Sequence, residues 1–294
     1  MKAIKLASVF AVSAVAAAVS TATFAAEAVF TGNAGVEYVT QNESKKTTTA
    51  NELSGTKEFE VEVSVDTGIV YAEIEIATDG ADEGTKIGME KLYVKQGAVK
   101  FGRFDGTVAT GSFFGMDEYF GGVDLKNATD SDGDLTGDTD NTGIRYMVSP
   151  ELTVAIEATN AVGDVDGEIG FAASYVMDFG GFKAGISGGA VGDANAVNVG
   201  VQTVAGPATV SLNYGSGAGG TDGDTDIELM TASVAFAASE ALTLTLEFSS
   251  DLEAETDGTY FVGEYAAGDL TYYVKNYAGD LGSELTKVGV KASF

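Results

Sequence analysis

The sequence predicts an all-β fold, a 16-stranded antiparallel transmembrane β-barrel. The first observation is that residues after position 26 form short segments in which apolar and polar side chains alternate. This period of two residues is typical of strands with two unlike faces. The second is that the links between these segments are alternately long and short. The third is an N-terminal leader that marks the chain for export.

Residues 1–25 differ in composition from the rest of the chain and read as a secretory signal peptide. Lys2 and Lys5 form a basic start, residues 6–20 are apolar, and Thr23 and Ala25 are the small residues that a cleavage site needs. A short membrane anchor is the alternative. No later stretch approaches the roughly 18 apolar residues of a membrane-spanning helix. We therefore expect residues 26–294 to form the mature domain.

The candidate strands follow one another from the leader to the C-terminus. The clearest are residues 57–66 and 242–250, each with one apolar and one polar face. Sixteen segments begin near Val29, Gly55, Gly68, Lys86, Ala98, Asn141, Leu152, Gly167, Phe182, Asn195, Ala208, Asp226, Leu242, Gly258, Leu270 and Ser283.

The links indicate an up-and-down meander with two different ends. The long links are residues 41–54, 79–85, 105–140, 161–166, 191–194, 216–225, 250–257 and 278–282. The short ones are residues 66–68, 96–98, 149–151, 179–181, 205–207, 239–241 and 267–269. In lipid only helices and closed barrels satisfy every backbone polar group. The polar face of each strand should then line a wet lumen, and the apolar face should meet lipid.

Composition excludes several functions. The 44 acidic and 16 basic residues give a net charge of −28, which leaves no basic surface for nucleic acid. The chain has no Cys and no His, so it lacks the usual nucleophiles, general bases and zinc ligands. An outer-membrane enzyme with an all-carboxylate site has no support in the sequence, and we expect no enzymatic activity and no cofactor.

The stretch from Phe101 to Tyr146 is the most informative part of the chain. It contains both arginines of the protein, Arg103 and Arg145, at the ends of a loop of about residues 105–140. Loops of this length are usually functional or disordered. Because a guanidinium on the lipid face of a barrel costs about 2–4 kcal/mol, we expect both arginines to face the lumen. The middle of the loop is aromatic, and we expect these side chains to anchor it to the inner wall: Phe113, Phe114, Tyr119 and Phe120.

The last segment alternates and ends on Phe294, as in Gram-negative outer-membrane proteins. Together with FGRF, the loop motif DEYFGG and NTGIRY, it resembles the general, non-specific trimeric porins. This resemblance implies a homotrimer in the outer membrane, in contact with lipid and lipopolysaccharide. It implies passive diffusion of ions and small hydrophilic solutes, and a long third external loop that folds inward and narrows the pore. It also implies that Arg103 and Arg145 face Asp117 and Glu118 across the constriction.

Alternation places further charged residues in the predicted lumen. They are Glu58, Glu60, Glu62, Glu73, Glu75, Lys91 and Lys95. Because cleavage of the signal peptide would remove Lys2 and Lys5, the mature chain is more acidic still. Its pore should therefore be negative on average. The sequence therefore predicts weak cation selectivity.

Three acidic runs, residues 130–140, 221–226 and 251–257, fall in the predicted external loops. Clustered carboxylates suit hard divalent cations, but the order of residues is not that of an EF-hand, and a solvated acidic surface is favoured. Two alternatives for the whole chain stay open. A porin specific for a sugar or an anion would need an aromatic track in the lumen, which alternation alone does not identify. A soluble acidic calcium-binding β-protein would bury its apolar faces.

Overall fold

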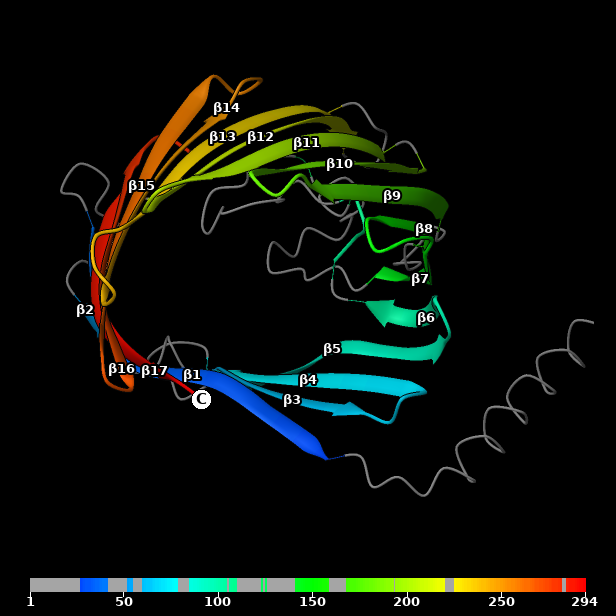
Figure 1. Ribbon diagram of the computed structural model, residues 1–294, viewed down its shortest axis with the longest axis horizontal. Coiled ribbons are helices and arrows are strands. Elements are labelled where there is room, and N and C mark those ends of the chain that lie inside the picture. Colours follow the sequence, from blue (N-terminus) through cyan, green and yellow to red (C-terminus); the bar gives the residue numbers. More distant parts are fainter. Residues whose placement is uncertain are drawn as a thin grey trace, which may run out of the picture.

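The computed structural model describes residues 27–41, 52–54, 60–78, 85–104, 106–109, 123, 125, 141–158, 168–192, 194–219, 225–281 and 284–294. They form a single antiparallel sheet that closes on itself as a barrel (Figure 1). The strands are β1 (Ala28–Gln41), β2 (Glu52–Ser54), β3 (Glu60–Asp66), β4 (Val70–Thr78), β5 (Thr85–Gln96), β6 (Val99–Phe104), β7 (Asn141–Met147), β8 (Leu152–Ala158), β9 (Ile169–Asp178), β10 (Phe182–Val191), β11 (Ala194–Ala205), β12 (Ala208–Gly219), β13 (Thr225–Ala237), β14 (Leu242–Asp251), β15 (Thr256–Ala267), β16 (Leu270–Gly279) and β17 (Leu285–Ser293). The predicted leader, residues 1–25, lies outside the described residues and stays a prediction.

The 17-stranded sheet has 16 positions around the barrel wall. β1 pairs with β3 through residues 28–33 and with the three-residue β2 through residues 37–39. β2 therefore continues the row of β3 along the same edge of β1 and adds no position to the wall. Each remaining strand pairs with its neighbours in sequence, so the predicted 16-stranded meander is confirmed.

The barrel closes where β1 meets β17. Their register runs from Asn33 opposite Ser293 to Gln41 opposite Leu285. Phe294 extends the seam, because its N–H donates to the carbonyl of Gly32 and its carbonyl accepts from the Gly32 N–H, both at 3.0 Å. These bonds leave neither β1 nor β17 as an open edge strand.

One end of the barrel carries tight turns. Gly97, between β5 and β6, has φ of +61°, a conformation that glycine adopts without steric cost. This turn pairs Gln96 with Val99, which fixes the register of the two strands. Two other turns at this end use a serine, since Ser149 Oγ accepts from Leu152 N at 3.2 Å and Ser239 Oγ accepts from Leu242 N at 3.1 Å.

At the opposite end of the barrel, where all links were predicted to be long, two links are short. β10 ends at Val191 and β11 begins at Ala194, so a link expected to be long is as tight as those at the other end. The link from β14 to β15 is also short, and Asp251 Oδ1 caps it by accepting from the backbone N–H groups of Glu253 at 3.1 Å and Ala254 at 2.9 Å. The side chain of Asp251 thus orders the backbone of this acidic run.

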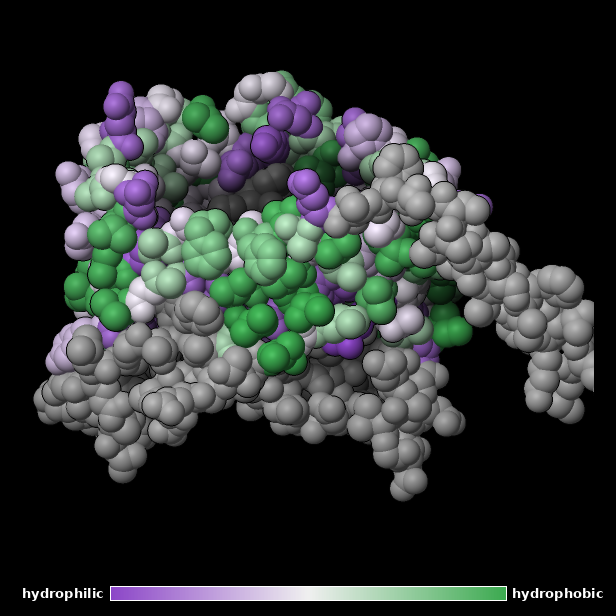
Figure 2. Space-filling view, turned by 90° about the horizontal axis from the view of Figure 1, so that it is seen from below, coloured by the Kyte–Doolittle hydropathy of each residue, from purple (hydrophilic) through white to green (hydrophobic). Residues whose placement is uncertain are grey.

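The wall is apolar outside and polar inside. Outward side chains such as Ile87, Ile169 and Phe171 are 71%, 72% and 68% exposed. By contrast, the inward side chains of Asn198 and Glu247 are fully buried. Figure 2 shows the described surface from the side as a broad hydrophobic band with hydrophilic side chains along the upper rim. The described residues contain no helix that is long and apolar enough to cross a membrane.

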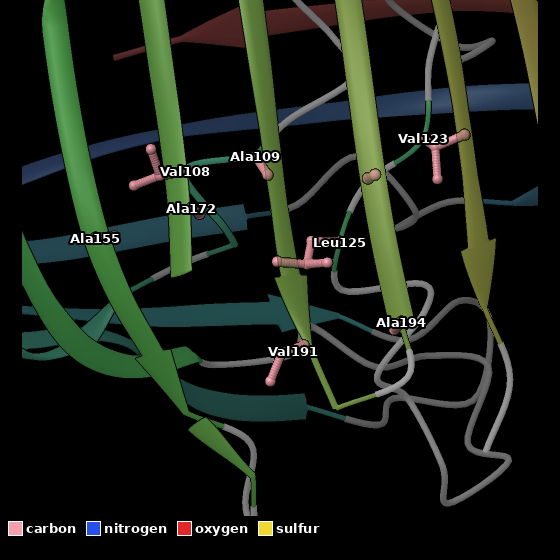
Figure 3. Packing of buried hydrophobic residues seen from close by; sticks show 9 residues of the cluster. Val108, Ala109, Val123, Leu125, Ala155, Ala172, Val191 and Ala194 are labelled. Carbon is pink, nitrogen blue, oxygen red and sulfur yellow. The ribbon is translucent and has the colours of Figure 1, made fainter. Parts of the chain in front are cut away.

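An apolar cluster lies against the inner wall at β8 to β11. Four residues from between β6 and β7 contribute to it, and all are at least 93% buried: Val108, Ala109, Val123 and Leu125. The wall contributes small side chains, which leave room for them (Figure 3): Ala155, Ala172, Val191, Ala194 and Ala196. These four residues thus pack against β8 to β11, and the path of the rest of residues 105–140 stays a prediction.

Candidate functional site: the polar inner wall

The inner wall from β10 to β14 is lined mostly by uncharged polar side chains, with Glu247 of β14 as a buried carboxylate among them. Alternate positions of these strands point inward, and their side chains are almost completely buried. The uncharged ones are Ser187, Asn198, Ser211, Asn213, Thr231, Ser233 and Ser249.

Three cations form a row across β5, β6 and β7, which we call the cation row. Lys95 pairs directly with Lys100, and Lys100 pairs directly with Arg145. Like charges placed directly opposite one another destabilise a sheet, so this arrangement needs compensation.

Aromatic rings give part of that compensation. Tyr71, Tyr93 and Phe104, the aromatic row, stack with ring centroids 5.0 Å and 5.1 Å apart. Lys95 Nζ lies 5.5 Å from the Tyr71 ring and Lys100 Nζ lies 5.2 Å from the Tyr93 ring. The guanidinium carbon of Arg145 lies 4.2 Å from the Phe104 ring. At these distances each cation is attracted by the negative face of its ring.

Carboxylates neutralise the two ends of the cation row but not its centre. Lys95 pairs with Asp66, and Arg145 Nη2 lies 3.8 Å from Glu157 Oε1. Among the residues that the structure describes, no carboxylate lies within ion-pair distance of Lys100. The Lys95 and Arg145 side chains are 24% and 21% exposed, so solvent reaches this wall.

The remaining predicted lumen residues lie on the inner side of neighbouring strands. Glu73 is 5% exposed and pairs with Lys91 and with the Tyr71 hydroxyl. Glu62 pairs across the sheet with Glu75 and accepts from the Thr31 hydroxyl at 3.2 Å. Glu60 shares the face of Glu62 two residues away.

Arg103 differs from Arg145 in its strand neighbours. It pairs with Leu92 and Thr142, whose side chains are exposed, whereas Arg145 pairs with the buried Ala155. The Nε atom of Arg103 is nevertheless buried, and the inward setting of Arg103 stays a prediction. Gly102, with φ of +144°, lies immediately before Arg103.

Several predicted residues lie outside the described residues, and their roles stay predictions. They are Glu58, Phe113, Phe114, Asp117, Glu118, Tyr119 and Phe120. At the start of this loop, Arg145 Nη2 donates to the Gly106 carbonyl at 2.6 Å. Glu157 accepts there from the Val108 N–H at 2.7 Å and from the Thr107 hydroxyl.

A second group of cations lies beside the seam on β16 and β17. Lys275 pairs directly with Lys287, and Lys287 Nζ lies 3.4 Å from the buried Glu37. The Tyr273 hydroxyl donates to Glu37 at 3.0 Å, and its ring covers Gly289, where a Cβ would come within 2.3 Å of it. Glycine at this position lets a β16 side chain reach across β17 to β1.

Two important inner-wall residues, Lys100 and Asn198, were not predicted. The signal for Lys100 was present, because a two-residue turn that pairs residues 96 and 99 must place it beside Lys95. No local pattern marks Asn198, whose partner is Val123, 75 residues earlier. Among the described residues, no group of three or more acidic side chains is arranged to hold a metal ion.

Comparison with known proteins relates the fold to solved porin structures. No protein-family model matches the chain, and no curated protein matches it. A mutant of Rh. blastica porin superimposes with a TM-score of 0.59 at 16% identity, over 91% of this chain and 100% of that one. OmpT of Vibrio cholerae, an outer-membrane protein in its trimer form, gives a TM-score of 0.64 at 13% identity, over 92% and 100%. The chain thus has the porin barrel fold.

Proposed function

We propose that the chain is an outer-membrane porin, a water-filled channel for passive diffusion of ions and small hydrophilic solutes. The observation that carries this proposal is the inverted wall, with exposed apolar side chains outside and polar or charged ones inside. A soluble protein rarely exposes a continuous apolar band, and a lipid-facing barrel requires one. This weighs against a soluble calcium-binding protein. Like the V. cholerae protein described as a trimer, it would assemble as a homotrimer among lipid and lipopolysaccharide.

The proposed route for solutes runs along the cation row. In this proposal the loop of residues 105–140 folds inward, with Phe113, Phe114, Tyr119 and Phe120 against the wall. Asp117 and Glu118 would then face Arg103 and Arg145 across a constriction, with Lys95 and Lys100 beside Arg145. The buried contacts of Val108, Ala109, Val123 and Leu125 with the inner wall support this arrangement. No cofactor takes part, and divalent cations would bind only loosely to the acidic external loops.

We propose weak cation selectivity from the net charge of −28 and the inner-wall carboxylates. The aromatic row favours a second candidate, a channel that prefers anionic solutes, and so does Lys100, which has no carboxylate partner among the described residues. The reversal potential across a salt gradient separates the two. A sign that favours anions would reject cation selectivity and support the second candidate.

Planar-bilayer conductance of the purified protein tests the channel itself. We expect current steps that are proportional to voltage, that come in groups of three for a trimer, and that small sugars do not block. A folded protein that inserts without conducting would reject the proposed function. Block by a single solute at low concentration would indicate a specific porin instead.

A further inference from the structure

The side chain of Asn198, on the inner face of β11, holds the backbone of Val123 in the barrel interior. Asn198 Oδ1 accepts from the Val123 N–H at 2.6 Å, and Asn198 Nδ2 donates to the Val123 carbonyl at 2.7 Å. Both residues are fully buried. The amide thus gives Val123 the two bonds that a neighbouring strand would give it.

The residues around this contact accommodate Val123 and Leu125, which we call the interior segment. Asn198 Nδ2 also lies 3.4 Å from Ser187 Oγ on β10. Two residues beyond Val123, Leu125 packs over Gly189 of β10, where a Cβ would come within 3.0 Å of Leu125 Cδ2. A larger residue at position 189 would displace the leucine. The polar contact and the apolar contact therefore lie side by side on one part of the wall.

Only an amide side chain can make both bonds to Val123. Aspartate has nearly the same shape and can accept from the N–H, but when ionised it cannot donate to the carbonyl. Alanine can do neither. A buried polar group that loses its partner is costly, so each change should loosen the segment by a different amount.

We propose that Asn198 is the positioning residue that fixes the interior segment at Val123 against β11 and thereby sets the free cross-section of the lumen. This inference rests on the proposed channel function. It also predicts a property of the folded protein that is measurable without any current. Asn198 touches no solute in this proposal and acts through Val123.

The direct test is hydrogen exchange of the Val123 amide in detergent-solubilised Asn198→Asp, Asn198→Ala and unaltered protein. We expect exchange to accelerate about fivefold or more in Asn198→Ala, with Asn198→Asp in between because it keeps the acceptor. Gln202→Glu is the matched control, since Gln202 lies on the same face of β11 and bonds to Ser211 at 3.1 Å. Rapid exchange in the unaltered protein, or equal rates in Asn198→Ala and Gln202→Glu, would overturn the inference.

Single-channel recording then links the contact to the pore. We expect Asn198→Asp to show noisier open current and to close at lower voltage than Gln202→Glu, which adds the same charge to the same wall. Matching traces from the two variants would overturn the role in setting the lumen. If the unaltered protein conducts no current, the channel function fails, while the exchange result still decides whether Asn198 holds Val123. Heat-dependent gel mobility verifies that each variant is folded.

Discussion

Lys100 is the middle member of the cation row, and its ammonium is balanced by an aromatic ring rather than by a described carboxylate. A solute charge about 4 Å away interacts with it by about 1 kcal/mol in water. Removing this charge would shift ion preference by about fivefold, since each 1.4 kcal/mol is a factor of ten, and we expect Lys100→Glu, which reverses the charge, to shift it toward cations by more than that. Reversal potentials in a salt gradient measure the shift.

Lys183→Glu is the matched control for this prediction. Lys183 is also inward by register, but it lies at the turn end of β10 and outside the cation row. If the two variants shift the reversal potential equally, only net charge matters, and the cation row has no special role.

At the scale of single residues, sequence alone did not predict that Lys100 lies between Lys95 and Arg145. The argument for this strand started from the cost of a guanidinium in lipid at Arg103, whereas the tight turn at Gly97 places Lys100 directly opposite Lys95. Turn register is stronger evidence than the cost of a single side chain, because a slip of one residue would reverse every side chain on the strand.

At the scale of elements, the pairing of β1 with β17 predicts that the last residue, Phe294, stabilises the barrel. Deleting Phe294 removes two backbone hydrogen bonds to Gly32, each worth about 0.5–1.5 kcal/mol. We expect the truncated barrel to unfold at a lower temperature, measured as the temperature at which its gel mobility changes. Phe294→Ala keeps both backbone bonds and should lose less stability. Equal losses would show that the ring, and not the backbone pairing, stabilises the seam.

The strands themselves were predictable because alternation repeats in each of them, and a barrel in lipid allows few other arrangements. β2 and the tight β10–β11 link were not predicted. β2 has three residues, too few to show a period, and its place depends on pairing with β1. The link at Gly192 is short because both strands extend further than their alternation suggested.

At the scale of the whole molecule, the inverted wall predicts that neighbouring residues of one strand respond oppositely to charge. Leu246 of β14 is 53% exposed on the outer face, and Thr245 points inward beside it. In a membrane barrel, Leu246→Lys should cost about 2–4 kcal/mol, whereas Thr245→Lys should be tolerated. Denaturant titration of the protein in lipid vesicles measures both. A harmless Leu246→Lys would indicate a water-exposed surface and reject the membrane barrel.

The overall architecture followed from sequence because it depends on patterns that every strand repeats. The interior did not, because contacts such as Asn198 with Val123 join residues that no local pattern relates. Even so, the small residues of β8 to β11 were visible in the chain. What the sequence lacked was the register that brings them against Val123 and Leu125.

The seam also constrains the order of folding. The Tyr273–Glu37 bond joins residues 236 positions apart, and Ser293 bonds to Asn33 across 260 positions at 2.5 Å. Contacts between such distant residues form late and slowly, because the entropy of closing a long loop must be overcome first. Until the last strand has been delivered, the first strand has a free edge that can pair with any other chain. We therefore expect the exported polypeptide to need protection from aggregation until its two ends have met.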